Sequence, residues 1–146
     1  MRQLQGRGPR VHLGAMRIRL GLLAWTGLIV LAVVPWGNLQ NHTHWNVVQW
    51  VPFVSPPQRA RDWVGNTLMY VPVGYLVMRA LSDRRRIWRA LAFATLLSFS
   101  TEVSQLYSHR RFPSTTDLVC NMAGAYIGVR LALRGERRRA LAVART

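Results

Sequence analysis

The sequence contains no lysine, a single cysteine and only five acidic residues among its 146 positions. One cysteine, Cys120, can form neither a disulfide nor a thiolate metal site within one chain, so it does not indicate a redox compartment. Because only five acidic residues oppose the twenty arginines, the formal net charge is +15. A chain of this length holds one domain of ordinary size and not two.

In a soluble protein, so strong a positive charge would suggest nucleic acid as the partner. Here half of the residues are hydrophobic, and they are gathered into blocks. Most of the arginines lie just outside those blocks, where flanking charge sets membrane topology. They form no stripe long enough to follow a nucleic-acid groove, so we expect no nucleic-acid partner.

Four apolar stretches come close to the length of about 20 residues that a helix needs to cross a bilayer. They are residues 19–36, 63–81, 87–106 and 117–133. Arginines that snorkel at the ends complete the shorter first and last stretches. The sequence therefore predicts an all-α fold, an integral membrane bundle of four transmembrane helices. The transmembrane domain covers residues 18–133, between a basic tail at 1–17 and an Arg-rich tail at 134–146.

The distribution of arginine predicts the orientation of these helices. Sixteen arginines lie in the N-terminal tail, the 79–89 turn and the C-terminal end, against four in the connections at 37–62 and 107–116. The positive-inside bias therefore places both termini in the cytoplasm and the two poorer connections outside. A cleaved signal peptide over residues 1–36 is the rival interpretation, but no small-x-small cleavage site follows that stretch.

The first outer connection is long and aromatic. It carries Trp45, Trp50 and Phe53, and this composition is typical of a segment that rests in the headgroup layer. His42 and His44 have no third metal ligand nearby in the sequence, so we expect no metal site.

The third stretch concentrates polar side chains on one helical face. Ser98, Thr101, Glu102 and Gln105 lie at positions i, i+3, i+4 and i+7. Leu96, Phe99 and Val103 are expected to point away from that face. One side of this helix should therefore pack against its neighbours while the other meets lipid.

The second and fourth stretches carry comparable faces. The fourth has Asp117 and Asn121 followed by Gly124 and Gly128, whose spacing permits close helix approach. The second has Asn66, Tyr70 and Gly74 on one side, beside a proline, Pro72, that kinks or loosens the helix. We expect the three polar groups to meet at one level near the outer surface.

An intramembrane carboxylate is a functional-site candidate by default, which singles out Glu102. The outward cations able to pair with Glu102 and Asp117 are Arg59, Arg61, Arg110 and Arg111. Such pairs would line an outward cleft. The alternatives are structural: Asp117 as a helix cap, the asparagines as interhelical glue, and the arginines as partners of lipid headgroups.

These residues resemble the VanZ-like family of small bacterial membrane proteins, most strongly over residues 62–133. The likeness lies in "NTLMYVPVGYLV" (66–77) and in a spaced series: Glu102, Gln105, Arg111, Asp117, Asn121, Gly124 and Gly128. Many family members have Asp-Lys-x-x-His at the start of the second helix, and here Asn66 stands at the histidine position. The resemblance implies a multi-pass protein of the bacterial inner membrane acting at the outer leaflet, in a family associated with teicoplanin resistance.

Our first hypothesis is a non-enzymatic protein that binds an amphiphile, either a lipid-linked cell-wall precursor or a lipoglycopeptide antibiotic. The expected ligand-binding residues are Asn66, Glu102, Gln105, Arg110, Arg111, Asp117 and Asn121. A groove beside Tyr70 and Gly124 is expected to take the acyl chain, with membrane lipids as the other partners and no cofactor. The alternative is an intramembrane enzyme acting on a lipid-linked phosphate, with Glu102 as general base. Two further hypotheses are a small transporter and a purely structural bundle.

Overall fold

The computed structural model describes residues 9–37, 39–54, 60–108 and 112–145. Those residues form four α-helices and one 3-10 helix, without a β-strand. The elements are α1 (Pro9–Val33), η1 (Trp45–Val47), α2 (Ala60–Ala80), α3 (Arg86–Gln105) and α4 (Thr115–Val143). The prediction of an all-helical chain is therefore confirmed.

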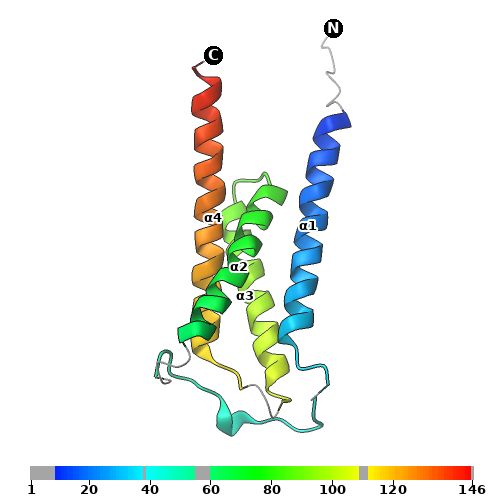
Figure 1. Cartoon of the computed structure of the whole chain (residues 1–146), viewed down its shortest axis with the longest axis vertical. Helices are drawn as coiled ribbons and strands as arrows, with labels where there is room; N and C mark the ends of the chain where they lie inside the picture. The colour runs from blue at the N-terminus through cyan, green and yellow to red at the C-terminus, as the bar shows by residue number, and fades with distance from the viewer. Residues whose placement is uncertain (1–8, 38, 55–59, 109–111, 146) are drawn as a thin grey trace.

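Consecutive helices run in opposite directions, as Figure 1 shows. The turn between α2 and α3 lies at the same end of the molecule as the two termini, whereas the α1–α2 and α3–α4 connections lie at the opposite end. We call the first of these the basic end, made of residues 9–19, 79–89 and 130–145. The second is the loop end, made of residues 34–37, 39–54, 105–108 and 112–116.

The bounds of the helices differ from those of the apolar stretches that predicted them, most of all in α1 and α4. α1 ends at Val33 and not at Trp36, because the residue before Pro35 is disfavoured in the α conformation. α4 continues to Val143, ten residues past the predicted boundary at 133. Its extension is rich in Arg and Ala, which are strong helix formers whether or not they are apolar.

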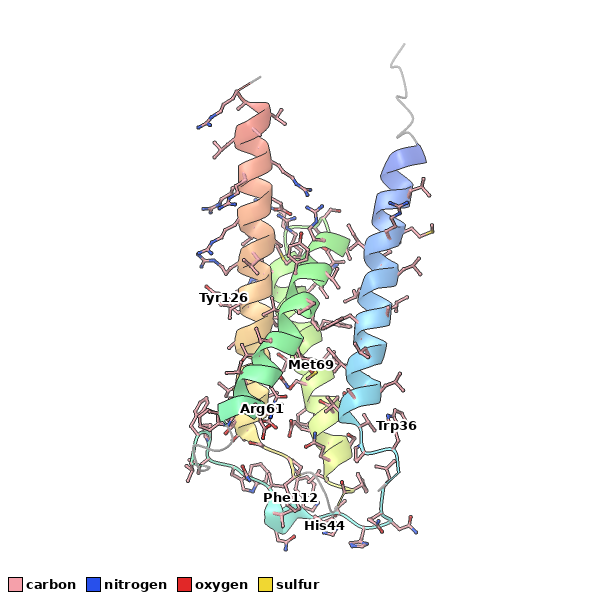
Figure 2. The ribbon with its side chains drawn as sticks, in the orientation of Figure 1. Trp36, His44, Arg61, Met69, Phe112 and Tyr126 are labelled. Atoms are coloured by element: carbon pink, nitrogen blue, oxygen red, sulfur yellow. The ribbon has the colours of Figure 1, made fainter. Side chains whose placement is uncertain are left out.

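Among the described helices, one segment is long and apolar enough to span a membrane by length and composition, Leu13–Val33. It packs against α2, where the indole nitrogen of Trp25 donates a hydrogen bond of 2.9 Å to the carbonyl oxygen of Met69. Figure 2 shows Met69 on α2 beside α1. Most of the described α1 surface remains exposed, and within residues 13–33 Ile29 is the one fully buried residue.

α2 and α4 are in backbone contact. A Cβ atom at Gly124 would overlap the carbonyl group of Thr67, and one at Gly128 would overlap the carbonyl oxygen of Val71. From the other side, a Cβ at Gly74 would overlap the backbone of Ala125. Only glycine allows the two helices to approach this closely, so these glycines set the distance between α2 and α4.

Candidate functional site

The connection between α1 and α2 is bound to the ends of α3 and α4 at the loop end. Four backbone hydrogen bonds make this attachment: Gln40 N to Tyr107 O at 2.8 Å, His44 N to Leu106 O at 2.9 Å, Gln49 N to Pro113 O at 3.0 Å and Thr115 N to Gln49 O at 3.1 Å. Figure 2 shows the connection running beneath the helix ends, with Trp36, His44 and Phe112 at this level. The connection is thus a strap that closes the loop end of the bundle.

Two threonines at the start of α4 hold the last part of this strap. The hydroxyl of Thr115 lies 2.9 Å from the carbonyl oxygens of both Gln49 and Trp50. The hydroxyl of Thr116 accepts a hydrogen bond of 2.8 Å from the backbone nitrogen of Phe53. Phe53 has a φ of 61°, a conformation that costs free energy in a bulky residue, so these contacts hold the strap in a strained turn.

A buried polar layer joins α2, α3 and α4. The amide nitrogen of Asn121 donates to the hydroxyl of Ser98 at 2.8 Å, and both residues are buried. From α2, the hydroxyl of Tyr70 faces the hydroxyls of Ser98 and Thr101. Tyr70 makes no hydrogen bond of regular geometry with the described residues, and the same holds for the amide oxygen of Asn121. Some polar atoms of the layer therefore make no hydrogen bond of regular geometry with the described residues.

Glu102 connects this layer to the start of α4. Its side chain is buried, and its Oε2 accepts a hydrogen bond of 2.7 Å from the backbone nitrogen of Ser114. Ser114 is the N-cap of α4, and its hydroxyl accepts from the backbone nitrogen of Thr116 at 3.2 Å. A negative charge at a helix N-terminus is stabilised by the helix dipole and by the free N–H groups there. The Glu102 carboxylate is therefore held by the end of another helix.

The assignment of Asp117 as the helix cap is wrong, because Ser114 occupies that position. Asp117 lies in the first turn of α4, where its charge also interacts favourably with the dipole. The sequence "STTD" allows either Ser114 or Asp117 as the N-cap. The residue at which the helix begins in the structure decides between them.

A groove of about 330 Å³ lies beside Glu102 at the loop end. Phe99, Val103 and Leu118 contribute apolar side chains from α3 and α4, and Trp45 and Trp50 contribute indole rings from the strap. The Glu102 side chain and Ser114 lie in the same lining. The result is an apolar groove with the buried carboxylate of Glu102 next to it.

Among the described residues no groove opens beside Tyr70 and Gly124, because both residues are buried and the backbone of α2 lies directly against Gly124. The groove lies instead on the face of α3 that carries Phe99 and Val103, which had been expected only to meet lipid. The spacing of Phe99, Glu102, Val103 and Leu106, at i, i+3, i+4 and i+7, is the signal that could have predicted it.

The predicted binding residues fall into three groups. Glu102, Gln105 and Asn121 are buried, whereas Asn66 and Asp117 are half-buried. Arg110 and Arg111 lie outside the described residues. Sequence reasoning placed Tyr70 beside the expected acyl-chain groove and Ser98 on the polar face of α3, but it counted neither of them among the ligand-binding residues. It also missed Ser114, which binds Glu102, while Tyr70 and Ser98 lie in the layer itself.

Comparison with known proteins identifies one family. The model of the VanZ/LLP1 family matches residues 19–135 of the chain. No curated protein and no solved structure matches the chain significantly.

Proposed function

Because the chain belongs to the VanZ/LLP1 family, we propose that it is a multi-pass protein of the bacterial cytoplasmic membrane that binds an amphiphilic ligand at the outer leaflet. The observation that carries this proposal is the apolar groove beside the buried carboxylate of Glu102. The ligand is either a lipid-linked cell-wall precursor or a lipid-tailed antibiotic such as teicoplanin. Binding, and not a chemical reaction, is the proposed activity.

The distribution of polarity supports four spanning helices. The interior of the bundle holds small or polar side chains on α3, namely Ala90, Ala94, Ser98 and Thr101. Large apolar side chains are exposed around the outside: Leu68, Trp88, Leu96, Phe99, Ile127 and Leu131. This pattern is unfavourable in water, since contiguous apolar surface is rare on soluble monomers. In a bilayer the same surface would contact acyl chains.

The two ends of the bundle support the orientation. The arginines of the turn at residues 84–89 and of the α4 segment 130–139 lie at the basic end, which is also the end of both termini (Figure 1). The positive-inside bias assigns this end to the cytoplasm. The loop end would then lie outside, with Trp36, Trp45 and Trp50 exposed at the level of the lipid headgroups.

The groove has the properties of a site for an acyl chain that ends in a polar group. Its volume lies at the lower end of the range for small-molecule pockets, about 300–1,000 Å³. Its wall includes Phe99 and Val103, which belong to the exposed surface of α3, so a lipid tail could enter from the side. Glu102 would bind a cationic or hydrogen-bond-donating group, and Arg110 and Arg111, close to Pro113 in the chain, would bind anionic groups.

Two alternatives have less support. An enzyme with Glu102 as general base would need further catalytic groups beside that carboxylate, and the described lining of the groove includes no histidine or cysteine. A transporter would need a polar path across the bilayer. Beyond Ser98, the buried positions on this face of α3 are Ala94 and Ala90, so the polar layer does not continue along that helix.

The test is to fill the groove without disturbing the bundle. Val103→Trp places an indole in the groove, whereas Leu96→Trp places the same side chain on the exposed face of α3, two turns away and outside the groove lining. We expect both variants to reach parental abundance in the membrane and only Val103→Trp to lose binding of teicoplanin, measured by fluorescence titration in nanodiscs. Teicoplanin from which the acyl chain has been removed should bind weakly to all variants.

Glu102→Gln tests the contribution of the charge. The amide retains the size of the side chain and an oxygen that can accept from Ser114, so we expect normal abundance together with weakened binding. Parental binding by both Val103→Trp and Glu102→Gln would refute the groove as the ligand site and would favour a purely structural bundle.

A further inference from the structure

A second groove, of about 340 Å³, lies at the basic end between the start of α3 and the middle of α4. One part of its lining is apolar and consists of Ile87, Val129 and Leu133. The other part consists of Tyr126 and three arginines, Arg130, Arg134 and Arg137, which we call the groove arginines. It is separate from the groove beside Glu102, with which it shares no lining residue.

The groove arginines follow one face of α4. Their spacing of i, i+4 and i+7 places them about one helical turn apart on the same side. All three are exposed. Past Asp117, the only acidic residue in the remaining sequence is Glu136, and both of its carboxylate oxygens bind Arg86, at 2.8 and 2.7 Å. Glu136 therefore balances an arginine of α3, and the positive charge of the groove persists.

One of the three guanidinium groups is oriented by an aromatic neighbour. Nη1 of Arg130 donates to the hydroxyl of Tyr126 at 2.9 Å, and its guanidinium carbon lies 5.7 Å from the centre of the Tyr126 ring. Figure 2 shows Tyr126 on the outer side of α4. A guanidinium held in this way loses less conformational freedom when it binds an anion.

We infer that this groove binds an anionic phospholipid of the cytoplasmic leaflet. The headgroup phosphate contacts the groove arginines, whose donors match phosphate oxygens in charge and geometry. An acyl chain of the same lipid lies along Ile87, Val129 and Leu133. The inference rests on the membrane orientation proposed above, and it is independent of the ligand of the outer groove.

The experiment compares two triple variants that remove the same charge. One replaces the groove arginines with glutamine, and the control replaces three arginines of the basic end that lie outside the groove lining: Arg84→Gln, Arg85→Gln and Arg139→Gln. Each protein is reconstituted in nanodiscs of phosphatidylcholine, with and without phosphatidylglycerol, and its thermal unfolding midpoint is measured. We expect phosphatidylglycerol to raise the midpoint of the parent and the control, and to leave that of the groove variant nearly unchanged.

Equal loss of the lipid effect in both triple variants would overturn the inference, because it would mean diffuse attraction to a charged surface. A parent that does not respond to phosphatidylglycerol would overturn it as well. Inorganic phosphate should not reproduce the shift, since it lacks the acyl chain.

If the triple variant does not fold, the single variant Arg134→Gln should lose part of the shift while Arg139→Gln keeps all of it. Failure of the parent to enter nanodiscs would instead contradict the membrane placement.

Discussion

The close approach of α2 and α4 predicts opposite effects for the same substitution at two glycines of one helix. At Gly135 a new Cβ meets no atom within 4 Å. Because alanine is a better helix former than glycine, Gly135→Ala should stabilise the protein by about 0.5–1 kcal/mol. At Gly124 the new Cβ overlaps the backbone carbonyl of Thr67, and a backbone group cannot rotate away as a side chain can.

The expected cost at Gly124 follows from that geometry. Overpacking a well-packed interior costs about 1–3 kcal/mol, and more where the backbone must move. After subtraction of the gain in helix propensity, Gly124→Ala should lower the free energy of unfolding by about 0.5–2 kcal/mol, and by more where the backbone must move. Adding Gly128→Ala, on the same interface, should cost less than its effect alone, because the first substitution has already separated the helices.

The assay is reversible unfolding of the purified protein in mixed micelles, followed by far-UV circular dichroism during titration with dodecyl sulfate. Gly65→Ala is a second control, on α2, because its new Cβ also meets nothing within 4 Å. A Gly124→Ala variant as stable as the Gly135→Ala and Gly65→Ala variants would refute the close packing of α2 on α4.

Three further outcomes are expected. Reporter fusions after Thr146 and within residues 107–116 should report cytoplasm and exterior respectively, and a cytoplasmic 107–116 segment would contradict the orientation. Glu102→Gln, Arg111→Gln and the double variant should show non-additive unfolding free energies, with a coupling of about 0.5–3 kcal/mol; strict additivity would mean that the two side chains do not interact. Asn121→Leu should lower thermal stability by removing the hydrogen bond to its serine partner on α3, and a neutral effect would mean that this bond contributes nothing net.

The candidate site was predictable where it depends on helical periodicity. Glu102, Gln105 and Ser98 occupy one face of α3 because their spacing follows the helical turn, and all three are buried in the structure. The glycines of α2 and α4 were predictable for a similar reason, since small residues at that spacing allow helices to touch. Tyr70 was placed on the correct face of α2, but its position within the polar layer depends on how α2 is rotated against α3.

By itself, the sequence determined the helical class, the order of the helices, the concentration of arginine at one end and the family, because each depends on local composition or on a spaced motif. The tertiary structure alone decided which face of α3 forms the groove, which residue caps α4, and which helix end holds Glu102. These features depend on contacts between residues far apart in the chain, such as that of Gln49 in the strap with Thr115 at the start of α4. No periodicity within one segment encodes where another segment will lie, so the groove appears only once the strap is packed against the bundle.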